Sequence, residues 1–265
     1  MLKRILLAWM IGFWLPVATP ISMMGQYVTA GFTAVGGGGG TVTFDAVGPA
    51  GGAGFSQTSG STTWTTFTAT WTHVVASSTD MGLIAGCTFT PGTGSAVATI
   101  AATFNGTNMV SDGSVLPNNT AAVGVVYLFH LVAPSTGSHS VVATATYVSG
   151  TKSSNDGLVC GSISFSRVNQ TAMTANKNSA YGSSGTPSVA ITSATNDMVV
   201  DVVGTGSPIT SSNQTIRWKL NTCCGGGGAA NSGAESTAAG AASVTMSYVV
   251  TSDYWGIIGV DIPHD

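Results

Sequence analysis

Charged side chains are scarce in this 265-residue chain, which has 7 Lys and Arg, 10 Asp and Glu, and Glu235 as its one glutamate. Soluble domains usually carry about 25% charged residues, whereas this sequence carries 6%. The scarcity excludes helical bundles and coiled coils, whose surfaces need Glu, Lys and Arg. It also excludes highly charged disordered chains, and the few cations form no basic patch for a nucleic acid.

Helical periodicity is also missing beyond residue 40, and alternating patterns take its place. From Thr66 to Val75, threonines alternate with aromatic and apolar residues, which is typical of a strand with one wet face. Val123–Val132 is instead a continuous apolar run and predicts a central strand covered on both faces. Short strands punctuated by turn pairs such as Pro91-Gly92 predict an all-β, antiparallel, two-sheet β-sandwich (jelly-roll-like) of about ten strands over residues 41–265.

Residues 1–40 differ from the rest of the chain. Lys3 and Arg4 precede an apolar run that is shorter than the roughly 20 residues of a membrane-spanning helix. We interpret the run as an apolar N-terminal arm that anchors the chain in an assembly, followed by the flexible tether Gly36–Gly40. The alternative is a secretory signal peptide over residues 1–20. The predicted anchor residues are Ile5, Leu6, Leu7, Trp9, Met10, Ile11, Phe13, Trp14 and Leu15.

The side chains that could perform catalysis are scattered. A glycosidase needs two carboxyl groups about 5–9.5 Å apart, but most aspartates lie beside turn residues, and Glu235 falls in a stretch of small residues, 225–242, that predicts a loop. His73 and His130 lie within predicted strands, where satisfied core groups are expected. The sequence has no nucleophile elbow, phosphate loop, or zinc or calcium spacing. We therefore predict a protein that is not an enzyme and holds no metal or cofactor.

Four cysteines are too few for a disulfide scaffold in a chain of this length. Cys87 and Cys160 lie in strand-like segments, where they could form a disulfide or remain buried apolar groups. The neighbours Cys223 and Cys224 could form a vicinal disulfide. In a bacterial cytoplasm all four would stay reduced.

Two aromatic residues lie in hydroxyl-rich segments and are expected to be exposed. Trp64 stands among serines and threonines, and Tyr181 lies in the segment Ser179–Gly185. Exposed aromatic rings can stack on sugars, whereas those within strands usually belong to the core. Trp64 and Tyr181 are therefore the candidate glycan contacts.

Several segments between Thr41 and Ile262 occur in a characteristic order. They are Thr41–Asp45, Trp71–Val74, Phe104–Gly106, Tyr127–Pro134, Gly137–Val142, Ile163–Gln170, Pro187–Val203, Arg217-Trp218 and Trp255–Ile262. In these segments the chain resembles a β-sandwich module that recurs in secreted bacterial proteins and in bacteriophage structural proteins. The resemblance implies the sandwich fold but no common activity, so it assigns no catalytic residue.

These observations favour a bacteriophage virion structural protein: a capsid decoration, fibre or tail-associated subunit. Residues 1–40 would dock on other capsid or tail proteins, and residues 41–265 would be displayed, as a homo-oligomer, with a host-surface glycan as a further candidate partner. The low charge suits copies that pack side by side. The alternative is an exported bacterial surface adhesin or carbohydrate-binding module, secreted or held at the cell surface.

Overall fold

A computed structural model describes residues 40–92, 95–224 and 231–265. The structure is 62% strand and 3% helix, and the strands pair in antiparallel sheets, so the all-β prediction is confirmed. These strands form four sheets, where the sequence predicts two. The predicted anchor, Ile5–Leu15, lies outside the described residues, as does the tether except for Gly40.

The first half of the described chain contains ten strands and two short 3-10 helices. The strands are β1 (Thr43–Gly48), β2 (Phe55–Thr58), β3 (Thr66–Val75), β4 (Gly82–Thr90), β5 (Val97–Phe104), β6 (Thr107–Asn108), β7 (Val110–Val115), β8 (Val125–Val132), β9 (Gly137–Ser149) and β10 (Gly157–Ser166). The helices are η1 (Pro117–Asn119) and η2 (Ala121–Val123).

The second half contains eight strands within the described residues. They are β11 (Ala175–Gly182), β12 (Ser188–Ile191), β13 (Met198–Thr205), β14 (Ile209–Ser212), β15 (Thr215–Cys223), β16 (Asn231–Ala239), β17 (Val244–Val250) and β18 (Trp255–Ile262). The predicted last two strands, residues 242–251 and 255–262, therefore match β17 and β18.

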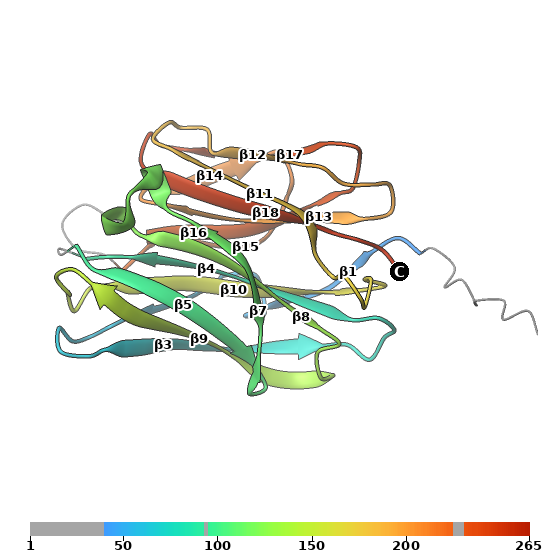
Figure 1. The fold of residues 1–265 in the computed structure, drawn as a ribbon, viewed down its shortest axis with the longest axis horizontal. Helices are drawn as coiled ribbons and strands as arrows, with labels where there is room; N and C mark the ends of the chain where they lie inside the picture. Colours follow the sequence, from blue (N-terminus) through green and yellow to red (C-terminus); the bar gives the residue numbers. More distant parts are fainter. Residues whose placement is uncertain (1–39, 93–94, 225–230) are drawn as a thin grey trace, which may run out of the picture. The chain divides into compact units, whose positions relative to one another are not determined.

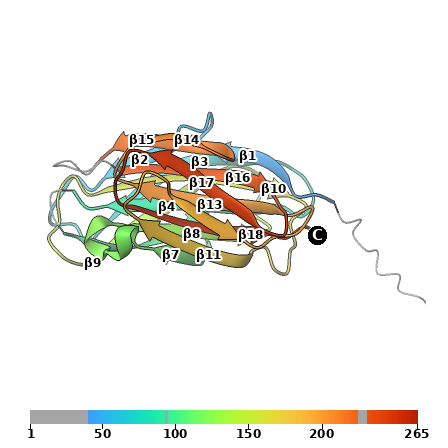
Figure 2. The ribbon, with the colours of Figure 1, turned by 90° about the horizontal axis from the view of Figure 1, so that it is seen from above.

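The four sheets lie in layers, as Figures 1 and 2 show from two directions. An outer sheet β3-β9-β5-β6 packs on the inner sheet β1-β10-β4-β8-β7, which also carries β2. The other face of that inner sheet contacts a second inner sheet, β11-β18-β13-β16-β15. The sheet β12-β17-β14 covers the second inner sheet from outside. Each half thus contributes one inner and one outer sheet.

The two halves repeat one strand order. When the small strands β2 and β6 are set aside, each half has eight strands, and its inner sheet runs first, eighth, third, sixth, fifth. The outer sheet of each half runs second, seventh, fourth. Because the sequences of the halves show no obvious repeat, the repetition is visible only in the topology.

Burial follows the layers. Side chains of β3 alternate strictly between exposed and buried, as its sequence predicts, because one face of its sheet meets solvent. All nine residues of β4 are buried, as are the eight of β18, because sheets cover both of their faces. Within the run Val123–Val132, residues Val125–Val132 form β8, which lies between β4 and β7, so the prediction of a central strand is confirmed. Four of its eight residues are buried and the other four are half-buried.

Glycines set the spacing between the two inner sheets. Gly86 and Gly161 pair across β4 and β10, and the fully buried indole of Trp218 from β15 packs against both. A Cβ at position 161 would lie 2.5 Å from three atoms of this indole. The neighbouring pair, Cys87 and Cys160, points toward the outer sheet. Glycine on one face therefore makes room for the tryptophan that joins the two halves.

Gly161→Ala should lower the free energy of unfolding by about 3 kcal/mol, at the upper end of overpacking costs, because Trp218 is enclosed and cannot move aside. Urea unfolding would measure the loss. Gly40→Ala is the control, since the nearest atoms there belong to the exposed side chain of Arg167. A loss at position 161 no larger than at position 40 would contradict this account of the interface.

The predicted loop 225–242 is wrong in part, because Asn231–Ala239 forms β16. This strand lies inside the second inner sheet, between β13 and β15. Small residues such as Gly233, which packs against Thr88, Val159 and Trp218, are needed where the sheets approach closely. In the sequence alone, this low-complexity composition predicts a loop. Glu235, expected in that loop, is fully buried in the strand.

Candidate functional site

An open groove of about 750 Å³ lies where the chain passes from β2 into β3. It is lined by Trp64, Gln57, Phe67 and five threonines, all of them uncharged. Trp64 is 51% exposed, which confirms the expectation that this ring is accessible. The groove therefore combines an aromatic surface with several hydrogen-bonding groups.

Hydrogen bonds fix the loop that carries Trp64. Lys152 donates its Nζ proton to the carbonyl of Trp64 at 2.7 Å and lies over the ring of Tyr147 at 4.9 Å. Ser59 donates its hydroxyl to the carbonyl of Ser153 at 2.7 Å and its amide to that of Asp156 at 2.8 Å. The loop before β3 is thus fastened to the segment between β9 and β10.

Asp156 organises that second segment. Its carboxylate accepts hydrogen bonds from the amides of Gly92 at 2.6 Å and Ser153 at 2.9 Å, and from the hydroxyl of Tyr147 at 2.9 Å. Burial raises the pKa of Tyr147 to about 12, so its hydroxyl stays a donor. Both carboxylate oxygens are used by protein donors, which gives Asp156 a structural role.

Tyr181 does not join this groove. It lies on β11 at the edge of the second inner sheet, whereas Trp64 belongs to the first half. It is also 51% exposed. The two candidate glycan contacts are therefore accessible rings in separate places, and only Trp64 lines the groove.

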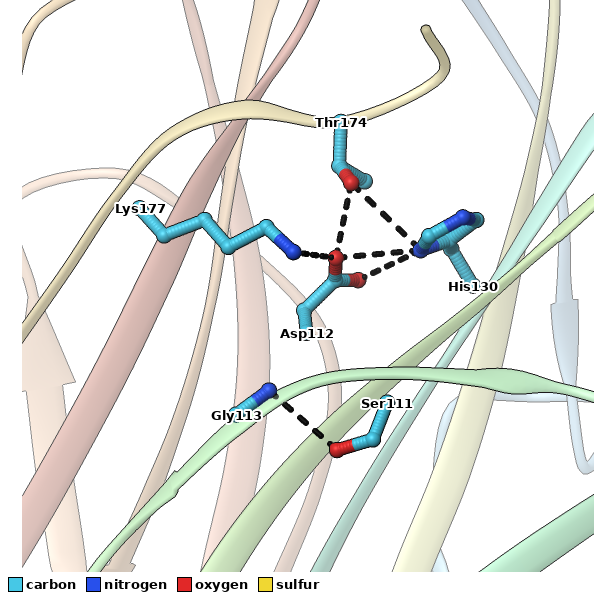
Figure 3. Close-up of polar contacts among 6 residues, drawn as sticks. All are labelled: Ser111, Asp112, Gly113, His130, Thr174 and Lys177. Carbon is cyan, nitrogen blue, oxygen red and sulfur yellow. Dashed lines mark hydrogen bonds and ion pairs between the residues drawn. The ribbon is translucent and has the colours of Figure 1, made fainter.

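A cluster of charged and polar side chains surrounds Asp112, as Figure 3 shows. The carboxylate of Asp112 has no exposed surface and contacts Nζ of Lys177 at 2.7 Å, the hydroxyl of Thr174 at 2.7 Å and Nδ1 of His130 at 3.0 Å. Asp112 lies at a bulge of β7 and His130 on β8, whereas Lys177 comes from β11. The cluster therefore connects the two halves. No spacing in the sequence predicts it, because its members are far apart along the chain.

Burial alone would raise the pKa of Asp112, but hydrogen bonds from His130, Lys177 and Thr174 outweigh it and hold the pKa below its ordinary value. Asp112→Asn should therefore lower the free energy of unfolding by about 3 kcal/mol near neutral pH, the lower end of costs for breaking a buried pair, since Lys177 can rehydrate. The loss should shrink as the pH falls below about 4, where the unfolded carboxyl protonates. Urea unfolding at several pH values would measure it, and a loss independent of pH in that range would contradict the ion-pair account.

His73 is a satisfied core group, as predicted. Its Nδ1 contacts the hydroxyl of Ser162 and its Nε2 that of Ser164, both at 2.9 Å, and Ser164 donates to Asp45 at 2.7 Å. Burial lowers the pKa of His73 to about 4, although Asp45 acts in the opposite direction. The imidazole is completely buried, so this chain of polar groups supports the sheets and meets no substrate.

Two buried carboxyls lie on β13 and β16. Asp201 accepts hydrogen bonds from Tyr248 at 2.9 Å and from the hydroxyl of Ser236, and burial raises its pKa to about 7. Glu235 accepts a hydrogen bond from the indole of Trp218, and burial raises its pKa well above the ordinary value. One oxygen of each carboxyl has no protein partner. Both lie in mid-strand, which for Glu235 contradicts the predicted loop.

The structure pairs Cys87 with Cys160 in a disulfide between β4 and β10. Both residues are completely buried, so of the two alternatives left open by the sequence the disulfide is the one observed. Cys223 and Cys224 are free thiols. A hydrogen bond with Cys224 lowers the pKa of Cys223, with burial opposing it.

Within residues 40–92, 95–224 and 231–265, no group of three or more His, Cys, Asp or Glu side chains is arranged to hold a metal ion. No helix in this part of the chain is long and apolar enough to cross a membrane. Comparison of the sequence with protein-family models and curated proteins, and of the fold with solved structures, found no match. The function must therefore be inferred from the geometry of the chain itself.

Proposed function

We propose that the chain is a non-enzymatic structural protein of a bacteriophage virion, a capsid decoration, fibre or tail-associated subunit. Residues 1–40 dock on capsid or tail proteins, and residues 41–265 are displayed as part of a homo-oligomer. The observation that carries the proposal is the strand order shared by the two halves.

That order supports a jelly-roll interpretation of each half. In a jelly roll the first, eighth, third and sixth strands share one sheet, and the second, seventh and fourth share the facing sheet. Seven of the eight strands in each half match this arrangement; the fifth lies beside the sixth in the inner sheet, whereas in a jelly roll it joins the facing sheet. Jelly rolls are common in viral capsid and lectin domains. Because one fold serves many functions, the strand order supports the virion role by analogy with viral jelly rolls.

The surface of the first outer sheet fits a displayed role. The exposed side of β3 carries Thr66, Thr68, Thr70 and Thr72, and cross-strand neighbours Thr144 and Thr146 continue it on β9. This face lacks charge, so copies of the chain can lie side by side without accumulating repulsion. Hydroxyl groups keep it hydrated.

Mass spectrometry of purified virions from the host strain tests the proposal. Peptides covering residues 1–40 and 41–265 should be recovered from the particles in stoichiometric amounts. Recovery only as a chain lacking the first 18 or so residues, free in the medium, would contradict it, because a cleaved signal peptide then explains the apolar run.

The Cys87–Cys160 disulfide favours a second candidate, the exported adhesin or carbohydrate-binding module. Disulfides persist in oxidising compartments and are rare in the cytosol. A virion protein assembled in a cytoplasm would acquire the bond only after release. N-terminal analysis of the mature protein separates the two candidates, since only the exported protein should begin near residue 20.

A further inference from the structure

We propose that the groove beside Trp64, defined above, is a binding site for a neutral oligosaccharide. The inference does not depend on how the chain is displayed, so its failure would leave the proposed virion role untouched. Of the two candidate glycan contacts, the proposed site includes Trp64 and does not include Tyr181.

The exposed indole provides the apolar part of the site. Trp64 leaves half of its surface in solvent at the wall of the groove, where burial of a ring against a ligand would be favourable. The ring-carbon faces of sugars are apolar, and they stack on aromatic side chains. Phe67 also lines the groove but is itself buried, so Trp64 presents the larger accessible ring.

The remaining wall matches the rest of a sugar. Sugar hydroxyls both donate and accept hydrogen bonds, as do the threonine hydroxyls and the Gln57 amide group. No carboxylate or cation lines the groove, so a sialylated, sulfated or phosphorylated glycan would meet no counter-charge there. The lining therefore selects uncharged chains.

The site is also preorganised. Lys152 holds the carbonyl of Trp64, and Ser59 fastens the start of the same loop to the segment beside β10. Within the loop, the hydroxyls of Ser61 and Thr63 lie 2.9 Å apart in a hydrogen bond. A binding loop that is already ordered loses less conformational entropy when its ligand binds.

Titration of the full-length chain with neutral hexasaccharides of glucose, mannose and N-acetylglucosamine tests the proposal, with sialyllactose and heparin as charged probes. Binding of at least one neutral chain is expected. Trp64→Ala should weaken it about ten-fold or more, and Trp64→Phe by less, because a ring remains. Tyr181→Ala is the matched control, since its ring is equally exposed on another sheet.

A second groove variant keeps the test independent of any folding defect in Trp64→Ala. Thr68→Glu places a charge on an exposed position of β3 and should weaken binding of the neutral chain by a similar factor. The proposal fails if no neutral hexasaccharide binds, if only the charged probes bind, or if Tyr181→Ala weakens binding as much as Trp64→Ala.

Discussion

Asp201→Asn should stabilise the protein relative to wild type far more at alkaline pH than at acidic pH. Between about pH 4 and pH 8, we expect the difference in free energy of unfolding between variant and wild type to shift in favour of the variant by about 4 kcal/mol. Urea unfolding of both proteins across this range would measure the shift.

The sign follows from the direction of the pKa shift. The folded state holds the pKa of Asp201 at about 7, above its ordinary value of 3.8. The folded state therefore retains a proton that the unfolded state has released, and stability is lost as the pH rises between those two values. The asparagine variant has no such proton to lose. Burial also raises the pKa of Glu235, but this carboxyl is present in both proteins, so the comparison removes the contribution that they share.

The wild-type profile alone would hide this effect. His73 has its pKa lowered from 6.5 to about 4, so its contribution to stability is lost as the pH falls through that interval. The contribution of Asp201 grows over nearly the same interval. These two opposing terms are each about 3–4 kcal/mol, so His73 masks part of the effect of Asp201 in the wild-type profile. Comparison of the variant with wild type removes the contribution of His73, which both proteins share.

Asp112→Asn supplies the matched control for Asp201→Asn. Its carboxyl is also buried, but its pKa is lowered rather than raised, so the cost of the substitution should stay nearly constant between about pH 4 and pH 8. If the Asp201→Asn profile runs parallel to that of wild type, Asp201 does not hold a proton in the folded state. That result would also contradict the buried placement of the Asp201 side chain between β13 and the covering sheet β12-β17-β14.

Local patterns in the sequence predict single strands well. The alternation from Thr66 to Val75 gives both the limits of β3 and the face that it buries. The alternation of polar and apolar residues shows whether one face of a strand meets solvent. It does not show which sheets cover a strand that is buried on both faces. The number of stacked sheets therefore could not be predicted from the sequence. β4, β10 and β18 are buried on both faces because the two halves of the chain stack, and this contact joins residues that are far apart in sequence.

Some features of the candidate sites could be predicted from local sequence, and others could not. The exposure of Trp64 and the buried, satisfied state of His73 follow from their immediate neighbours in the sequence. The cluster around Asp112 depends on β7, β8 and β11 meeting in space, which no spacing along the chain reveals. Whether Trp64 binds a glycan, and whether Ile5–Leu15 anchors the chain, both stay predictions.

The cross-link between Cys87 and Cys160 should be the largest single contribution to stability after the core. It closes 73 residues of chain and joins two neighbouring strands of the inner sheet. A loop of this length restricts the unfolded chain enough to stabilise the folded state by about 4 kcal/mol. Cys87→Ala with Cys160→Ala should therefore lower the free energy of unfolding in urea by at least about that amount, since the two buried sulfur atoms are lost as well.

Cys223→Ala with Cys224→Ala is the matched control, because those thiols are free and only half-buried. It should change the free energy of unfolding by less than about 1 kcal/mol, and its urea midpoint should still fall when dithiothreitol is added. The midpoint of the Cys87/Cys160 variant should not respond to the reductant. Thiol titration of denatured, unreduced wild type should find two reactive groups, Cys223 and Cys224. Four reactive groups would show that the strands hold the two sulfurs together without a bond, and the stability of the inner sheet would then rest on packing alone.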